Sequence, residues 1–368
     1  MAVCFVFVPP SLARADEPSG DVVERDGLNY EWIDEGGGIF RSSEPTYETR
    51  VGNPCFRRVH IPESIGDAKI RGVIAWDAEP HYHPRGPRST IQTEMWRAFA
   101  AKHRFGMVEL ASRPIGVEET VAQIEGILED MDVLYGRDEC RHACYTFGGT
   151  SGTGQDTLEL ASHRPVAGRM IAGIPCSCDP GRHPPTSNVP LLVMNAGMEV
   201  YAAPRFPAGV PSSLERSAEL VRDGFPVGTA VRLSAKHPQF RDDVGAKDEV
   251  NRQIAHSMLF AMAWLDAVIA RRVPAGDPPA GRPFELLEID PTEGWLATCE
   301  VDPPGGKGID VDRGEASGAV SRYGHVFIGC QIAAYDDFPG GLAAAKVWLP
   351  DEKTARLWKT FHETGGVE

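Results

Sequence analysis

Residues 142–155 read HACYTFGGTSGTGQ, and the interpretation of the whole chain depends on this stretch. The apolar run that ends at Phe147 predicts a buried strand, and the glycines after it predict a tight turn into a helix. Ser151 lies inside that turn. Two interpretations are open: a serine nucleophile on a sharp strand-to-helix turn, or a glycine-rich loop that cradles a phosphate group.

The glycine spacing favours the serine turn. The sequence Gly149-x-x-Gly152-x-Gly154 differs from Gly-x-Gly-x-x-Gly, and no lysine follows where a P-loop requires one. A nucleophile turn has the pattern Gly-x-Ser-x-Gly, and here Thr153 replaces the last glycine. In such a turn the N–H of Gly152 would point toward a developing oxyanion at the start of a helix.

Strands and helices alternate on both sides of this turn. The expected strands are 56–61, 72–76, 106–110, 142–147, 169–174, 189–194 and 229–234. The expected helices are 92–103, 118–134 with a glycine cap at Gly136, one that contains 157–162, 214–221 and 250–269. This order predicts the α/β class: a mostly parallel, doubly wound sheet with helices on both faces.

The domain organisation follows from changes in composition. We predict a signal peptide at 1–15, an N-terminal extension at 16–49 and the α/β domain at 50–272. The remainder, 273–368, starts with the Pro/Gly-rich link PAGDPPAGRP and continues as an irregular C-terminal extension. We expect three tryptophans to anchor this extension on the main domain, namely Trp295, Trp348 and Trp358.

Charge and hydropathy exclude several kinds of partner. The chain has 37 basic and 52 acidic residues, a net charge of -15, which argues against nucleic acid and anionic membranes. No segment approaches the roughly 18 apolar residues of a membrane span. The first residues, MAVCFVFVPPSLARA, combine an apolar run with a small-x-small site but lack a positive n-region. We favour a secreted or periplasmic protein over a cytoplasmic one with an N-terminal tail.

Seven of the eight cysteines would remain after removal of a signal peptide, so at least one thiol is free. The Cys176-x-Cys178 and Cys140-x3-Cys144 spacings differ from the usual Cys-x2-Cys of zinc sites. We therefore rank one or two disulfides ahead of a metal site and predict no metal or other cofactor. Buried, reduced thiols fit the sequence equally well.

The carboxyl ends of parallel strands are where such sheets place their active sites. His237, in LSAKHPQFRDD, follows one expected strand and is the candidate base; Glu199 follows the strand PLLVMN and is the candidate acid. With Ser151, these residues occur in the order nucleophile, acid, base. Three other carboxylates stay open as the acid: Asp179, Asp242 and Asp243.

Four segments together resemble the α/β-hydrolases, in the group that includes polyhydroxybutyrate depolymerases and feruloyl esterases. They are TFGGTSGTGQDTLELASHRP at 146–165, PLLVMNAGMEV at 190–200, RLSAKHP at 232–238 and AMAWLDAVIARRVP at 261–274. The resemblance covers about residues 50–272 and implies hydrolysis of a carboxylic ester, small or polymeric, through an acyl-serine.

The resemblance also implies roles for individual residues. Ser151 would be the nucleophile, His237 the general base and Glu199 the group that orients the imidazole. The N–H groups of Gly152 and Ala78 would form the oxyanion hole. The loop that contains Ala78 departs from the family, because the sequence has Trp76-Asp77 where the family has His-Gly.

Two other classes of function remain open on the sequence. One is a binding protein that keeps the fold without catalysis. The other is a metal-dependent hydrolase, because His81-Tyr82-His83 follows a strand and a His-x-His pair can chelate zinc.

Overall fold

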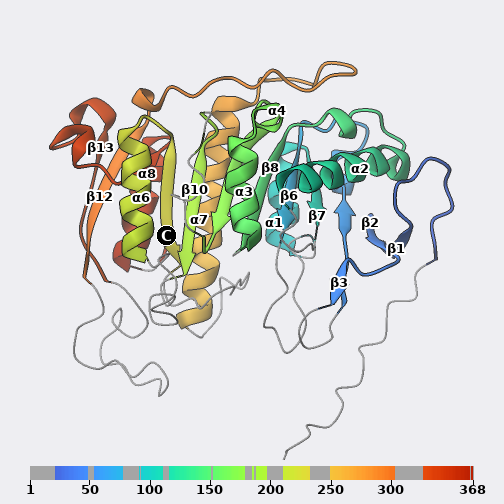
Figure 1. Cartoon of the computed structure of the whole chain (residues 1–368), viewed down its shortest axis with the longest axis horizontal. Helices are drawn as coiled ribbons and strands as arrows, with labels where there is room; N and C mark the ends of the chain where they lie inside the picture. Colours follow the sequence, from blue (N-terminus) through green and yellow to red (C-terminus); the bar gives the residue numbers. More distant parts are fainter. Residues whose placement is uncertain are drawn as a thin grey trace, which may run out of the picture.

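The computed structural model describes residues 21–48, 54–77, 91, 93–110, 116–150, 152–178, 185, 188–196, 210–232, 249–302, 326–364 and 366–367. Within them, a nine-stranded sheet has the order β1-β2-β5-β7-β6-β8-β9-β10-β11 (Figure 1). In chain order, its strands are β1 (Trp32–Gly36), β2 (Ile39–Ser42), β5 (Arg58–His60), β6 (Gly72–Asp77), β7 (Phe105–Glu109), β8 (Tyr145–Thr150), β9 (Met170–Cys176), β10 (Leu191–Ala196) and β11 (Val227–Arg232). The six strands from β7 to β11 in this order run parallel, and β5, β2 and β1 continue the sheet in antiparallel pairs.

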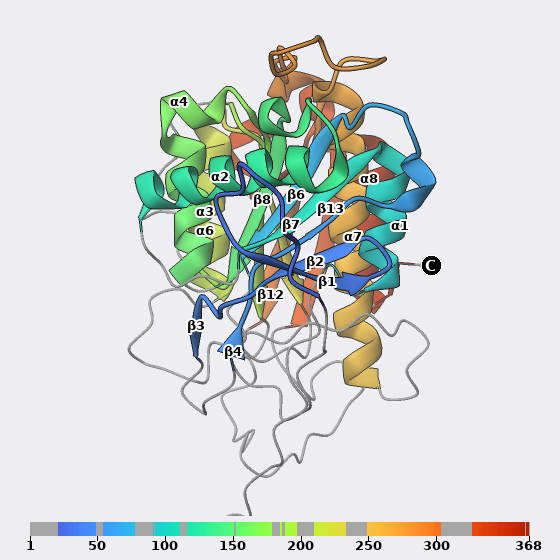
Figure 2. The same ribbon diagram turned by 90° about the vertical axis from the view of Figure 1, so that its right-hand side faces the viewer.

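Helices cover both faces of this sheet, as Figures 1 and 2 show. One face carries α2 (Val117–Tyr135), α3 (Gly152–Ser162) and α6 (Val210–Arg222); the other carries α1 (Glu94–His103), α7 (Glu249–Arg272) and α8 (Glu352–Thr364). Every residue of β7, β8 and β9 is buried, which is expected for strands covered on both sides. The predicted fold class, a mostly parallel doubly wound α/β sheet, is confirmed.

The ends of the elements show where local sequence determines them. Thr93 caps α1 through its side chain, which accepts a hydrogen bond from the N–H of Trp96 at 3.4 Å. Gly136 ends α2 with φ +63, as predicted. The strand expected at 142–147 instead occupies Tyr145–Thr150, so the turn after it is shorter than the glycines suggested.

The N-terminal extension contributes two strands to the main sheet, a feature that the sequence did not indicate. A buried carboxylate on α2 holds the segment that leads into β1. Asp130 accepts hydrogen bonds from the N–H groups of Asn29 and Tyr30 and from Nε1 of Trp32, at 2.6, 3.0 and 2.7 Å. Trp32 is fully buried. A small separate sheet pairs β3 (Tyr47–Glu48) with β4 (Pro54–Cys55).

The C-terminal extension is more regular than its sequence suggests. Besides α8, it contains an antiparallel sheet in the order β13-β12-β14, with β12 at Trp295–Asp302, β13 at Val326–Ala334 and β14 at Val347–Leu349. Trp348 and Trp358 are buried as expected, and Trp295 is partly buried against the core. Nε1 of Trp358 donates to the carbonyl oxygen of Thr229 in β11 at 2.7 Å, which ties the extension to the main sheet.

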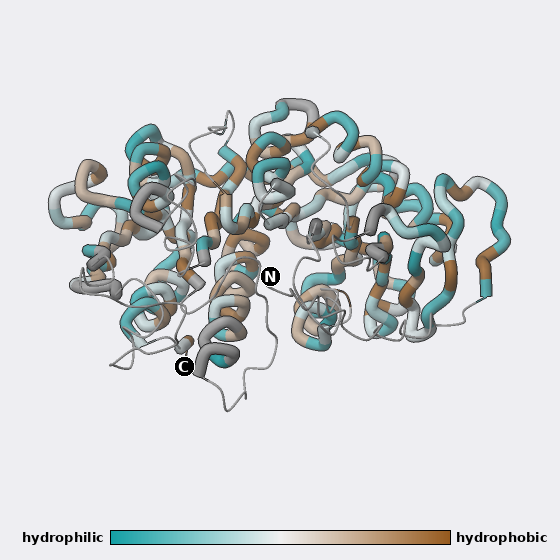
Figure 3. Tube along the Cα trace, turned by 60° about the horizontal axis from the view of Figure 1, so that its bottom comes forward, coloured by the Kyte–Doolittle hydropathy of each residue, from teal (hydrophilic) through white to brown (hydrophobic). Residues whose placement is uncertain are grey.

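Short connecting elements complete the described chain: the 3-10 turns η1 (Glu63–Ile65), η3 (Cys140–His142), η4 (Pro291–Glu293), η5 (Tyr335–Asp337) and η6 (Gly341–Ala343), and the one-turn helix α4 (Arg164–Ala167). Figure 3 shows hydrophobic segments gathered inside the layers and hydrophilic ones on the outer helix faces. None of the described helices has the length and apolar character needed to cross a bilayer.

Candidate active site

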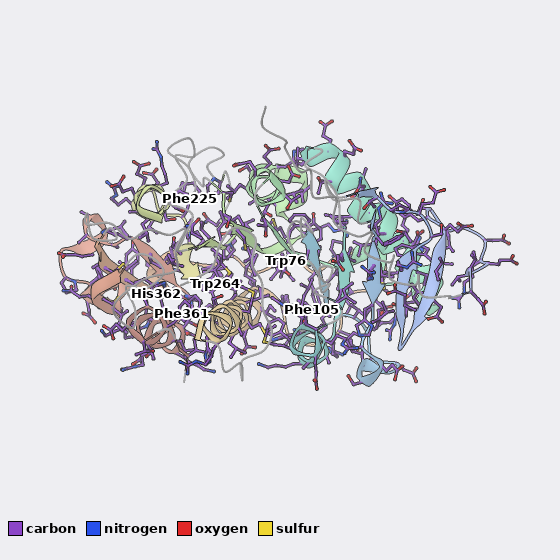
Figure 4. All side chains as sticks on the ribbon, turned by 90° about the horizontal axis from the view of Figure 1, so that it is seen from below. Trp76, Phe105, Phe225, Trp264, Phe361 and His362 are labelled. Carbon is purple, nitrogen blue, oxygen red and sulfur yellow. The ribbon has the colours of Figure 1, made fainter. Side chains whose placement is uncertain are left out.

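The order of the strands defines one position in the sheet where a site is expected. The chain leaves β6 through α1 toward β7, and it leaves β8 through α3 toward β9, on the opposite side and over the opposite face. Between the adjacent strands β6 and β8 the winding direction therefore reverses, and ligands of open α/β sheets bind beyond the carboxyl ends of the strands at such a reversal. Figure 4 views the molecule from this edge.

The turn after β8 is a single residue long. Strand β8 ends at Thr150 and helix α3 begins at Gly152, so residue 151 alone connects them. Ser151 itself lies outside the described residues. A serine between a strand and a helix that follow each other without a loop has the chain position of the nucleophile in Gly-x-Ser-x-Gly turns.

Thr153 replaces the second glycine of that pattern, and its side chain is accommodated by the turn. Its Oγ1 lies 2.9 Å from the N–H of Thr150, from which it accepts a hydrogen bond, and 2.9 Å from the carbonyl oxygen of Thr150, to which it donates. Thr153 is fully buried. The threonine therefore joins the last residue of the strand to the first turn of the helix instead of blocking the turn.

The remaining glycines allow the close approach of strand and helix. A Cβ added to Gly149 would lie 2.5 Å from the carbonyl oxygen of Thr153, and one added to Gly154 would lie 2.7 Å from the carbonyl oxygen of Cys176 in β9. Real Cβ atoms do not approach backbone this closely. The glycine pattern thus serves packing around residue 151, although its spacing differs from Gly-x-Ser-x-Gly.

Trp76 is directed into the interior between the sheet and α1. Its ring packs against Trp96 of α1 with centroids 5.8 Å apart, it covers Gly148, and only 3% of it is exposed. Gly148 must lack a side chain here, because a Cβ would lie 2.3 Å from the Trp76 ring. The bulk of this tryptophan is accommodated in the core.

The residue after Trp76 ends β6 beside the strand that leads to residue 151. Asp77, the last residue of β6, is paired in register with Gly149, two positions before residue 151. Ala78, predicted as the second oxyanion donor, follows immediately and lies outside the described residues. Gly152, the first predicted donor, is described and is the first residue of α3.

The predicted acid and base are also outside the described residues. Glu199 comes three positions after the end of β10, and His237 five positions after the end of β11. Strands β8, β9, β10 and β11 are neighbours in this order, so their ends share one edge of the sheet. Five other residues from the sequence analysis have no described position either: His81, His83, Asp179, Asp242 and Asp243.

Asn195 was not identified as a site residue from the sequence. It is the second-last residue of β10 and has a polar side chain. Its side chain is fully buried, and its Nδ2 donates to Oγ of Ser213 in α6 at 2.6 Å. This bond fixes the end of β10, which precedes Glu199 in the sequence. A single amide at the end of the apolar run PLLVM is the signal that could have found it.

Another histidine has a structural role that the helical pattern did not indicate. His256 of α7 is only 4% exposed, and its Nδ1 accepts a hydrogen bond from the N–H of Val367 at 3.2 Å. The C-terminal residues cover this side of α7 and bury the ring.

Six cysteines are buried free thiols: Cys140, Cys144, Cys176, Cys178, Cys299 and Cys330. Within the described part of the chain, no group of three or more His, Cys, Asp or Glu side chains has the arrangement of a metal site.

The strand order, the reversal between β6 and β8 and the one-residue turn define a sheet of the α/β-hydrolase type. No family model matches the sequence, and no curated protein matches it.

Many solved structures resemble the chain at low identity. One is the fluorophosphonate-binding serine hydrolase F (FphF) of Staphylococcus aureus: 10% identity, 62% of this chain and 96% of that chain covered, TM-score 0.38. A second is an acylaminoacyl peptidase in complex with Z-Gly-Gly-Phe-chloromethyl ketone: 12% identity, 68% and 47% covered, TM-score 0.43. A third is a thermostable esterase: 12% identity, 57% and 67% covered, TM-score 0.33.

Proposed function

We propose that this protein is a serine hydrolase that cleaves carboxylic esters through an acyl-serine intermediate on Ser151. The observation that carries the proposal is the single residue between β8 and α3, at the position where the winding of the sheet reverses. On either side of this serine, the Thr153 hydroxyl bonds the backbone of Thr150. Gly149 and Gly154 allow the strand and the helix to pack closely there.

The proposed reaction has two half-reactions. His237 removes the proton of Ser151, the alkoxide attacks the ester carbonyl, and the alcohol leaves with the proton that His237 returns. Water then attacks the acyl-serine with His237 as the base, and the carboxylic acid is released. Glu199 holds the imidazole in the required tautomer throughout.

The charge that develops on the carbonyl oxygen needs donors fixed in advance. The N–H of Gly152 lies in the first turn of α3, where backbone N–H groups have no partner within the helix and the helix dipole is positive. Ala78 comes directly after β6, the strand next to β8 in the sheet, and is proposed as the second donor. Loss of one such donor costs about 10²- to 10³-fold in kcat in serine hydrolases of this kind.

The test compares wild-type protein, Ser151→Ala and Ser162→Ala in the hydrolysis of p-nitrophenyl acetate and butyrate. Ser162 is the matched control, because it lies at the other end of α3 and its hydroxyl donates to the carbonyl oxygen of Leu158 at 2.9 Å. We expect Ser151→Ala to lower kcat by a factor of about 10³ or more, while Ser162→Ala retains activity.

A fluorophosphonate probe separates a live enzyme from a protein that only keeps the fold. An activated serine reacts covalently with the probe, so peptide mapping should find the label on Ser151 in the wild type and in Ser162→Ala. Labelling of another residue, or equal hydrolysis by Ser151→Ala, would overturn the assignment. Circular dichroism of each variant establishes that it is folded.

A further inference from the structure

Two cysteines of the C-terminal extension face each other across an antiparallel strand pair. Thr298 of β12 is opposite Gln331 of β13, and Glu300 is opposite Ile328, so Cys299 faces two residues, 329 and 330. The extra residue makes a β-bulge, and Gly329 has φ +62, the left-handed conformation that this kind of bulge requires. The bulge brings Cys330 opposite Cys299.

The two thiols touch inside the protein. The side chains of Cys299 and Cys330 are hydrogen-bond partners, and the two residues are only 2% and 4% exposed. Two other described thiols contact backbone: Sγ of Cys144 donates to the carbonyl oxygen of Phe284 and Sγ of Cys176 to that of Ile174, each at 3.6 Å. The pair in β12 and β13 therefore differs from buried cysteines that act as small apolar side chains.

Two ammonium groups lie beside this pair. Nζ of Lys346 donates to the carbonyl oxygen of Cys299 at 2.8 Å, and Nζ of Lys359 donates to that of Cys330 at 2.9 Å. The hydrogen bond from Cys299 lowers the pKa of Cys330, with a smaller contribution from Lys359; burial and Glu363 oppose it. Cys330 is thus the thiol of the pair that more readily gives a nucleophilic thiolate.

We propose that Cys299 and Cys330 are oxidised to a disulfide that joins β12 to β13. With oxidised glutathione as the oxidant, the Cys330 thiolate attacks one glutathione sulfur and releases the other glutathione as a thiol. The Cys299 thiolate then attacks Sγ of Cys330 in this mixed disulfide and releases the second glutathione. The two protein thiols lose two electrons and two protons, which convert one oxidised glutathione into two reduced ones.

The disulfide would stabilise the extension where it meets the main sheet. Strand β12 lies between β13 and β14, and α8, which carries Lys359, packs on β13 and donates from Trp358 to β11. A crosslink between residues 299 and 330 closes the chain between them and restricts the unfolded state. Such bonds persist in oxidising compartments and are rare in a reducing cytosol.

The experiment uses the full wild-type chain in glutathione buffers of increasing oxidised-to-reduced ratio. Samples are quenched in acid, alkylated in denaturant with one reagent, reduced, alkylated with a second reagent and digested with trypsin. We expect the second label on Cys299 and Cys330 to rise together, and peptides 273–307 and 323–346 to be joined in unreduced digests. Cys144 should keep the first label at every ratio.

Cys299→Ala provides the second arm. Without its partner, Cys330 should stop at the mixed disulfide and carry glutathione, whereas the wild type should carry none at equilibrium. Thermal unfolding of the wild type should show a higher Tm in the oxidised than in the reduced sample. Free alkylation of both cysteines in oxidised glutathione, or a crosslink of either one to a different cysteine, would overturn the proposal. Neither result depends on esterase activity.

Discussion

The hydroxyl of Thr153 bonds both backbone polar groups of Thr150, at 2.9 Å each, across the single residue that separates β8 from α3. Both threonines are fully buried, so water cannot replace these two bonds. A residue that departs from the expected glycine pattern therefore stabilises the turn that the pattern describes.

Thr153→Val should destabilise the protein, because valine keeps the shape of threonine but leaves the N–H and carbonyl oxygen of Thr150 without this partner. We expect a loss of about 1–3 kcal/mol in the free energy of unfolding, measured by urea denaturation. Thr153→Ser keeps the hydroxyl and should lose less. A valine variant as stable as the wild type would show that the two bonds contribute little.

Gly149→Ala should be among the most damaging single changes in this region. The added Cβ would meet the carbonyl oxygen of Thr153 at 2.5 Å, so strand and helix must move apart. We expect a loss of at least about 2 kcal/mol and poor recovery of folded protein.

Gly168→Ala is the matched control for that change. Gly168 follows α4 with φ -64, and a Cβ there would meet nothing within 4 Å. Alanine at this position should leave stability unchanged or raise it slightly, because it reduces the entropy of the unfolded chain. Equal behaviour of the two alanine variants in urea denaturation would contradict the steric argument at Gly149.

Most of the parallel sheet could be predicted from the sequence because each strand is an apolar run and each helix has a one-sided apolar pattern. The long helix α7, for example, was expected at 250–269 and occupies Glu249–Arg272. The strands β1 and β2 were not predicted, because they are short and are held by residues far along the chain. Trp32 is buried through its bond to Asp130, 98 residues away.

The candidate site could be predicted in its chain position but not in its details. A strand, a glycine-rich turn and a helix around Ser151 follow from local sequence alone. The length of β8 does not follow from local sequence. The strand continues through Gly148 and Gly149, which lack side chains where the Trp76 ring and Thr153 pack against them. Those contacts join three elements, and no local pattern contains them.

Asp130→Asn should loosen the attachment of the N-terminal strands. The carboxylate accepts from four donors: the N–H groups of Asn29 and Tyr30, Nδ2 of Asn29 and Nε1 of Trp32. Asparagine turns one acceptor into a donor, so at least one of these groups would face an N–H₂. We expect a loss of about 1–3 kcal/mol and earlier cleavage near residues 25–45 in limited proteolysis.

Glu129→Gln is the control for Asp130, because Glu129 lies next to it on α2, is exposed, and accepts a hydrogen bond from Nδ2 of Asn29 at 3.2 Å. Its cleavage pattern should match that of the wild type. If Asp130→Asn also matched the wild type, the anchoring role of the buried carboxylate would be wrong.

His362 should make stability depend on pH below neutrality. The imidazole is buried: Nδ1 donates to the carbonyl oxygen of Trp358 at 2.8 Å, and Nε2 accepts from the N–H of Val231 in β11 at 3.2 Å. Burial lowers the pKa of His362 from 6.5 to about 4. Above pH 6.5 the ring is neutral in both folded and unfolded states, and it contributes no pH dependence.

Between pH 6.5 and about 4, only the unfolded state binds the proton, so the free energy of unfolding must fall as the pH falls. The full loss is about 3 kcal/mol for a shift of this size. His362→Gln removes the titrating group while Oε1 can still accept from Val231. The variant should be less stable than the wild type at pH 8, and the difference should shrink toward pH 4 in urea unfolding. Parallel pH profiles for the two proteins would mean that His362 does not titrate in this range.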